Sequence, residues 1–257
     1  MKAIRAHEWC GPRDLSIDEI EQPQPGDGQV LVKVNVGGLN FPDILIISGK
    51  YQFKPALPFS PGFEIAGTVE KIGPRVSKFS EGQRVIAQVP VGGFAEYAIA
   101  DEAATHLLPD TMNDDEGAAF PLVYQTEDFV DVVKRETNGH GADVIYDPVG
   151  GEVGERSTKC IAFEGRLVIV GFTSGKFSNF VSNHVLVKNY SVVGLHWGAY
   201  RQNNPGKIEQ GWNELIELYK TGLLKPVIGG RYHMEAVAGA MEFLASRKAV
   251  GKIVLHW

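Results

Sequence analysis

The fold of this chain is decided by residues 141–175, which read GADVIYDPVGGEVGERSTKCIAFEGRLVIVGFTSG. Within this stretch an apolar run, Asp143–Tyr146, precedes a helix predicted over about Val153–Ala162 and a second apolar run, Arg166–Phe172. Strand, helix and strand at this spacing predict two parallel strands joined by a crossover helix. A third apolar run, from about Ser191 to Trp197, extends the predicted sheet. Because parallel sheets are normally covered on both faces, we expect these strands to be buried on both sides.

The residues before this stretch predict a different architecture. Between Lys2 and Ala104 the chain contains short runs rich in β-branched residues, separated by Gly and Pro turns. The clearest runs are Val30–Val36, Ile65–Ile72, Gln83–Gln88 and Glu96–Ala100. This pattern predicts a small barrel-like or sandwich domain.

Three further segments have the periodicity of helices. Glu127–Thr137 carries apolar residues at helical spacing before a predicted stop at an Asn-Gly pair. Two more helices are predicted near the C-terminus, Gly206–Thr221 with Gly222 as its cap, and Met234–Arg247. A final apolar run, Lys252–Leu255, predicts a last strand.

Composition and charge exclude several classes of protein. The 257 residues are 44% apolar and 22% charged, which is the profile of a globular chain with a sizeable core. A formal charge of -6 and no run of Lys or Arg argue against nucleic acid or an anionic membrane as a partner. No stretch approaches the roughly 20 apolar residues of a membrane span, so a cytoplasmic location is predicted. Cys10 and Cys160 lack the spacing of metal or redox pairs and are expected to be free thiols.

A family resemblance covers essentially the whole chain. The blocks that carry it are, in order, MKAIRAHEWCGP, GLNFPDILIISGKYQFKPALPFSPGFEIAGTVEKIG, GGFAEYAIA, AAFPLVYQT, GADVIYDPVGG, GRLVIVGFTSG, SVVGLHWGAY and VGKIVL. Together they resemble the zinc-free, zeta-crystallin-like quinone oxidoreductases, a branch of the medium-chain dehydrogenase/reductase superfamily. The resemblance implies an α/β fold with three parts. These are a GroES-like, β-rich substrate domain over residues 1–123, a remnant of a Rossmann cofactor domain over 124–198, and a C-terminal segment, 199–257, that returns to the substrate domain.

The resemblance also implies an activity, the transfer of hydride from NADPH to a quinone or enone without a metal. Zinc-dependent relatives carry a Cys near the position of Asn40 and a His in a Gly-His-Glu motif, which here reads Gly62-Phe63-Glu64. Zinc needs about three protein donors and Phe63 supplies none, so no metal is expected. Without a Lewis acid, hydrogen-bond donors must stabilise the substrate oxygen. The resemblance places Asn40 and Tyr51 there, although a turn role for Asn40 and a packing role for Tyr51 stay open.

The cofactor half departs from the family pattern. A dinucleotide site needs a strand, a Gly-rich turn and a helix N-terminus that faces the phosphates. In relatives, a long helix, three strands and an AAGGVG-type loop lie between the blocks that here meet directly at Thr126 and Glu127. NADP(H) binding is therefore expected to be weak or absent. The resemblance still assigns the nicotinamide end to Thr126, Gly171, Phe172 and Ser174, and it assigns Lys252, in the C-terminal block that closes the cleft, to cofactor binding.

A replacement for the missing loop could lie in Val149–Gly154. This segment follows a predicted strand and precedes a helix, and Gly151 and Gly154 have the spacing of the second and third fingerprint glycines. Val149 stands where the first glycine should be, however, and Glu152 would direct negative charge toward phosphates. A simple strand-to-helix turn is the favoured interpretation.

The sequence leads to two hypotheses about function and one about oligomeric state. The first function is an NADPH-dependent quinone or enone oxidoreductase, impaired in this chain. The alternative is a non-catalytic ligand-binding or structural protein derived from the same family. The family resemblance also predicts a homodimer through Ser191–Trp197, while loss of three strands would leave Asp143–Tyr146 as a new sheet edge that invites pairing.

Overall fold

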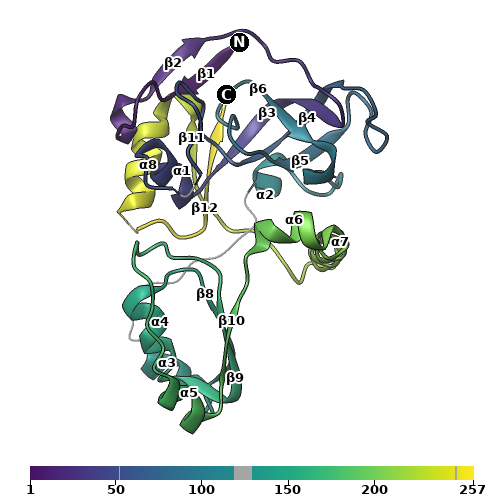
Figure 1. The fold of residues 1–257 in the computed structure, drawn as a ribbon. Helices are drawn as coiled ribbons and strands as arrows, with labels where there is room; N and C mark the ends of the chain where they lie inside the picture. Colours follow the sequence, from purple (N-terminus) through teal and green to yellow (C-terminus); the bar gives the residue numbers. More distant parts are fainter. Residues whose placement is uncertain (52, 119–128, 247) are drawn as a thin grey trace. The chain divides into compact units, whose positions relative to one another are not determined.

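The computed structural model describes residues 1–51, 53–118, 129–246 and 248–257. The chain divides into two compact units (Figure 1). Unit 1 comprises Met1–Tyr124 and Asn213–Trp257, and unit 2 comprises Gln125–Trp212. The C-terminal residues belong to unit 1 because their last strand pairs with a strand near the N-terminus.

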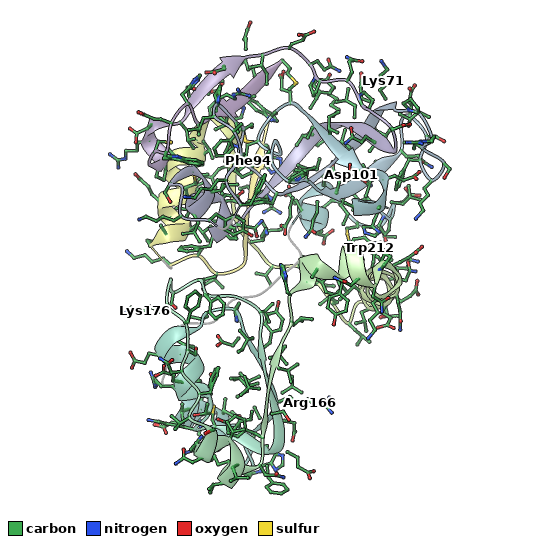
Figure 2. The ribbon with its side chains drawn as sticks, in the orientation of Figure 1. Lys71, Phe94, Asp101, Arg166, Lys176 and Trp212 are labelled. Atoms are coloured by element: carbon green, nitrogen blue, oxygen red, sulfur yellow. The ribbon has the colours of Figure 1, made fainter. Side chains whose placement is uncertain are left out.

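Unit 1 is built on a seven-stranded sheet of order β11-β12-β3-β4-β5-β7, with β6 also paired to β3. Its strands are β3 (Gln29–Leu39), β4 (Glu64–Ile72), β5 (Arg84–Gln88), β6 (Tyr97–Asp101), β7 (Thr105–Leu107), β11 (Ile228–His233) and β12 (Lys252–His256), and a separate hairpin pairs β1 (Lys2–Arg5) with β2 (Ser16–Glu19). The predicted β-runs and the final predicted strand are confirmed. Alternating apolar residues such as Val30, Val32 and Val34 face the core, and Phe94 is fully buried inside this unit (Figure 2).

Short helices cover parts of this sheet. They are α1 (Phe41–Ile47), α2 (Asp114–Ala118), α8 (Val237–Ala245) and the 3-10 turns η1 (Pro12–Asp14), η2 (Glu102–Ala104) and η4 (Met234–Ala236), while α7 (Pro205–Lys220) begins in unit 2 and ends in unit 1. The predicted helix Gly206–Thr221 is confirmed within one residue at each end. Gly222 ends it in the left-handed region, φ +75°, as expected of a glycine cap.

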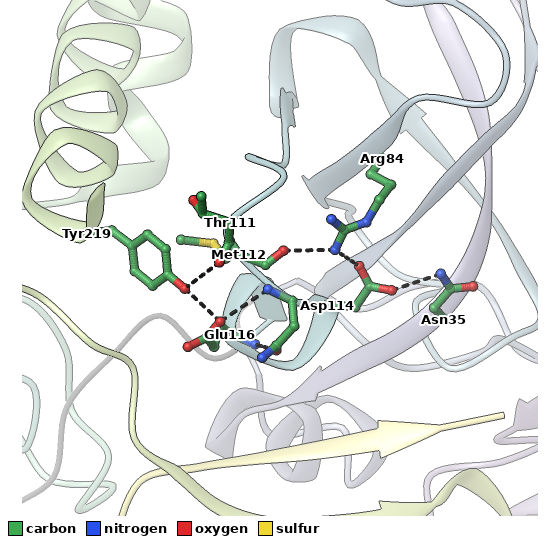
Figure 3. Close-up of polar contacts among 8 residues, drawn as sticks. Asn35, Arg84, Thr111, Met112, Asp114, Glu116 and Tyr219 are labelled. Carbon is green, nitrogen blue, oxygen red and sulfur yellow. Dashed lines mark hydrogen bonds and ion pairs between the residues drawn. The ribbon is translucent and has the colours of Figure 1, made fainter. Parts of the chain in front are cut away.

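A polar network fastens α2 to its neighbours (Figure 3). The Arg84 guanidinium lies 2.6 Å from Asp114 Oδ1, and Asn35 donates to the other oxygen of Asp114. From α7, the Tyr219 hydroxyl donates to Glu116 at 2.7 Å. Burial, and then the Glu116 carboxylate, raise the pKa of Tyr219 to about 12. These contacts hold the end of α2 against β3, where the candidate site lies.

Unit 2 is a three-stranded parallel sheet of order β10-β9-β8, as the crossover pattern predicted. Its strands are β8 (Ala142–Asp147), β9 (Ile161–Ile169) and β10 (Ser191–Gly194), and its helices are α3 (Phe129–Glu136), α4 (Gly151–Ser157), α5 (Ser182–Lys188), η3 (Trp197–Ala199) and α6 (Tyr200–Asn203). Helices α3, α4 and α5 lie along one side of the sheet (Figure 1). On that side Leu167 is buried, and the partly buried Ile145 and Val192 flank it on the neighbouring strands.

The expectation that these strands are buried on both faces is wrong. Val144 and Tyr146 of β8 are 63% and 50% exposed, and Val193 of β10 is also exposed. They share the face opposite the helices, since neighbouring residues of a strand point to opposite sides. No described helix of unit 2 covers this second face. Helices α3, α4 and α5 thus pack against one face of the sheet only.

Two predicted boundaries in unit 2 are also wrong. The helix predicted to reach Ala162 ends at Ser157, because Cys160 closes a turn by donating its N–H to the Ser157 carbonyl. Ile161 can then enter β9 and pack against Leu167. Strand β10 stops at Gly194, so the chain at Trp197 is already a 3-10 turn.

Among the helices that the structure describes, none has the length and apolar character that crossing a membrane requires.

Candidate functional site

A buried carboxylate joins two loops of unit 1. Asp43, the third residue of α1, is fully buried, and its two oxygens accept the backbone N–H groups of Asn40 at 2.7 Å and Gly62 at 3.1 Å. Asp43 thus lies in the first turn of the helix. Burial raises the pKa of Asp43 to about 8, and the Glu64 carboxylate acts in the same direction, while the two N–H groups and Lys252 oppose the shift. Asp43 therefore sets the positions of both Asn40 and the loop before Glu64.

Asn40, Glu64 and Lys252 form a compact hydrogen-bonded cluster. The Lys252 ammonium donates to Asn40 Oδ1 and to Glu64 Oε2, each at 2.6 Å. The Asn40 amide donates in turn to Glu64 Oε2 at 3.0 Å and to the Gly38 carbonyl at 3.3 Å. The Lys252 side chain is only 5% exposed, whereas that of Glu64 is 27% exposed. The cluster thus borders the surface on the Glu64 side.

Three adjacent strands bring these side chains together. Strand β3 lies between β12, which carries Lys252, and β4, which begins at Glu64. Gly38 of β3 pairs with Val254 on one side and with Glu64 on the other. A Cβ on Gly38 would lie 2.5 Å from the Ala118 carbonyl, 3.1 Å from Lys252 Cε and 3.3 Å from Glu64 Oε2. The absence of a side chain at Gly38 therefore lets the ammonium and the carboxylate meet across the central strand.

An aromatic pair lies next to this cluster in the sequence. The rings of Tyr51 and Phe63 are 5.6 Å apart and tilted, and both pack at the edge of the core. Phe63 directly precedes Glu64. Of the two residues predicted to orient a substrate, Asn40 lies in the polar cluster, whereas Tyr51 lies in the ring pair.

The donor set does not fit a catalytic zinc ion. No group of three or more His, Cys, Asp or Glu side chains that could hold a metal occurs in the described part of the chain. Asn40 Oδ1 and Glu64 Oε2 face a common point, and the Lys252 ammonium occupies that point. Zinc bound there would have to displace that ammonium and would find one carboxylate and one amide.

The residues from Gly171 to Ser174 that were assigned to the nicotinamide end make contacts within unit 2. Phe172 packs edge to face against Phe177 at 4.7 Å, the backbone N–H of Gly171 points to the Asp147 carbonyl, and the Ser174 hydroxyl bonds to the backbone of Lys176. Thr126 lies outside the described residues. Lys252, from unit 1, is held in the cluster described above.

The turn after β8 does not fit the phosphates of NADPH. Its backbone N–H groups at Val149 and Gly150 already donate to Asp147 Oδ1, each at 2.9 Å. Gly150 has φ +68°, and Glu152 stands in the first turn of α4, where it opposes an anion. Close packing explains Gly154, because a Cβ there would lie 2.5 Å from Asp147 Oδ2. The preferred interpretation of Val149–Gly154 as a strand-to-helix turn is confirmed.

Sequence reasoning did not single out Glu64 or Asp147. Glu64 was visible as the acid of the Gly-Phe-Glu motif, but its partner lies 188 residues further along the chain. Asp147 ends an apolar strand before a Gly-Gly turn, which is a position where a side chain can cap the turn.

Comparison with known families places this architecture in a class. Residues 26–110 match the alcohol dehydrogenase GroES-like domain family, and residues 117–255 match the zinc-binding dehydrogenase family. The chain therefore belongs to the medium-chain dehydrogenase/reductase superfamily, and its fold is α/β with a GroES-like domain and a shortened Rossmann-type sheet, as predicted.

Within that superfamily the chain belongs to the quinone oxidoreductase-like family. It is 31% identical to the quinone oxidoreductase-like protein 2 homolog of Nematostella vectensis, covering 99% of this chain and 88% of that protein. The bovine quinone oxidoreductase-like protein 2 is 28% identical, over 95% of this chain and 89% of the relative. Among solved structures, the Escherichia coli quinone oxidoreductase complexed with NADPH superimposes with a TM-score of 0.87 at 22% identity, covering 100% of both chains. This last likeness concerns the fold alone.

The alignment with the Nematostella protein also measures what is missing. It spans 324 positions against the 257 residues of this chain, a difference of 67. At least that many positions of the relative have no counterpart here. A βαβ unit takes about 30 residues or more, so the difference is large enough to contain the missing part of a Rossmann sheet.

Proposed function

We propose that this chain keeps the quinone or enone site of an oxidoreductase in unit 1 and has lost effective use of NADPH. The observation that carries the proposal is the contrast between its two halves. Unit 1 holds an ordered cluster, Asn40, Glu64 and Lys252, and an aromatic pair whose Phe63 directly precedes Glu64. Unit 2 has a three-stranded sheet whose one Gly-Gly turn is closed by Asp147.

The substrate class is argued from chemistry. A quinone or enone has a flat, apolar ring or chain and a carbonyl oxygen that accepts hydrogen bonds. The Tyr51 and Phe63 rings supply apolar contact surface, and the Lys252 ammonium supplies charge-assisted donors. Nicotinamide, when bound, would supply the hydride, and the residues of this chain would bind and orient the acceptor.

A non-catalytic protein that binds such ligands is the second candidate. It is favoured by the engagement of the Val149 and Gly150 amides with Asp147, which withdraws these two N–H groups from a phosphate. In that case the chain would bind a quinone without reducing it.

NADPH titration tests whether the chain still holds the cofactor. Loss of two phosphate contacts, each worth about 1.5–3 kcal/mol, would weaken binding by at least about 100-fold. We therefore expect nicotinamide fluorescence to give an affinity at least about 100-fold below that of the Escherichia coli relative measured in parallel. Reduced nicotinamide mononucleotide, which lacks the adenosine half, is the control and should bind about as weakly as NADPH. Micromolar NADPH binding would contradict the proposal.

We further propose a homodimer formed through the strand edge at Ser191–Trp197. Strand β10 is one edge of the described sheet and pairs only through Val168 and its neighbours of β9. Proline at Val193 removes a backbone donor from what would become a central strand, so Val193→Pro should yield monomers. Val193→Thr keeps the N–H and the branched shape and should stay dimeric. Light scattering that gives one mass for wild type and the proline variant would refute this interface.

A further inference from the structure

We infer that Lys252 donates the hydrogen bond that holds the carbonyl oxygen of a bound quinone or enone, an inference that rests on the proposed function. The family resemblance assigned Lys252 to the cofactor and Asn40 to the substrate. The hydrogen bonds of the cluster indicate instead that Lys252 contacts the substrate and that Asn40 positions Lys252.

Asn40 has no donor left for a ligand. Its amide has two N–H groups, and these face Glu64 Oε2 at 3.0 Å and the Gly38 carbonyl at 3.3 Å. Its oxygen accepts from Lys252 at 2.6 Å. Turning the amide over would bring its NH2 group against the ammonium, so the orientation is held by charge.

Lys252 does have a donor left. An ammonium has three N–H groups, of which Asn40 Oδ1 and Glu64 Oε2 accept two. The third is not accepted by any residue that the structure describes. Glu64, an acceptor when ionised, cannot bind a carbonyl oxygen, and among these three side chains only Lys252 can.

The surroundings of Lys252 suit a neutral carbonyl. The ammonium is almost fully buried, but it is paired with Glu64, so the cluster needs no further anion to balance its charge. The partly exposed Glu64 marks where the cluster approaches the surface. Phe63, the next residue in the chain, belongs to the ring pair that would contact the flat part of the ligand.

Binding of duroquinone without cofactor tests this role. Its ring is fully substituted, so it cannot add the thiol of Cys10. Removing one charge-assisted hydrogen bond should weaken binding by about 10- to 150-fold, and Lys252→Met is expected to do so. The infrared carbonyl stretch of bound duroquinone should be lowered in wild type and return toward its value in apolar solvent in Lys252→Met.

Two controls separate this role from a structural one. Lys252→Met alone leaves Glu64 without its cation, so the same substitution is repeated in Glu64→Gln, where the fold-change should persist. Durene, the hydrocarbon of the same shape without oxygens, should bind wild type and Lys252→Met equally. If the wild type and Lys252→Met bind duroquinone with equal affinity and give the same infrared frequency, the inference is overturned and the proposed function stands. No duroquinone binding by the wild-type chain would overturn both.

Discussion

Steady-state assays should show little or no NADPH-dependent reduction of 1,4-benzoquinone or 9,10-phenanthrenequinone by this chain. The nicotinamide is a small part of the cofactor, and most of its binding comes from contacts to the phosphates and ribose. Here the described turn that could hold phosphates has the N–H groups of Val149 and Gly150 bonded to Asp147, and at least 67 positions of the Nematostella relative have no counterpart. Without that anchorage the nicotinamide is seldom held in the geometry that hydride transfer needs.

The assay has a clear positive control and a clear failing outcome. The Escherichia coli quinone oxidoreductase, assayed under the same conditions, shows that reagents and quinones are competent. Boiled protein corrects for direct reaction of NADPH with the quinone. A turnover number between about 1 and 1000 per second that saturates at micromolar NADPH would show that the chain holds the cofactor by residues we have not identified.

Replacing Asp43 should cost more stability than any other single change in the candidate site. Asp43→Ala leaves two backbone N–H groups without an acceptor, the buried one of Gly62 and the partly buried one of Asn40. Each costs about 1–3 kcal/mol, so urea unfolding should show a loss of about 2–6 kcal/mol. Because the same two bonds position Asn40 and the loop before Glu64, duroquinone affinity should fall as well.

Asp14 provides a matched control. It also accepts a backbone N–H three residues earlier, that of Gly11 at 3.0 Å, but it is exposed. Water can replace the lost acceptor there, so Asp14→Ala should cost less than about 1 kcal/mol. Equal losses for the two variants would show that burial is not the reason for the effect at Asp43.

The same carboxyl predicts a pH dependence. Its folded-state pKa, about 8, lies above the ordinary value of about 3.9. The folded chain therefore holds this proton more tightly than the unfolded chain, and the resulting stability is fully present below about pH 4 and is lost as the pH rises through 8. Between pH 5 and 8.5 the free energy of unfolding of the wild type should decline relative to that of Asp43→Asn, which has no carboxyl to titrate. A constant difference over this range would mean that Asp43 is ionised throughout.

The sequence alone was sufficient for the order and type of most elements. Parallel strands around Val144 and Leu167 follow from two apolar runs joined by a helix, and the end of α7 at Gly222 follows from the backbone freedom of glycine. Such features depend on residues that are close in the chain, so local periodicity reveals them. The family followed from ordered blocks in the same way.

The exposure of the β8 side chains could not be predicted from the apolar pattern of the sequence. Val144 and Tyr146 have the apolar character of a strand covered on both faces, yet one face of their sheet has no described helix over it. Whether an apolar side chain is buried depends on which other elements are present to pack against it.

The candidate site was decided by tertiary structure. The sequence offered Asn40 and Lys252 separately, for different roles, and did not single out Glu64. Their contacts join residues 188 and 212 positions apart, and they form only because β12 and β4 flank β3 at Gly38. Hydrogen bonds between side chains so distant in sequence depend on strand pairing and on the space left by a glycine, and neither is encoded in the spacing of the residues themselves.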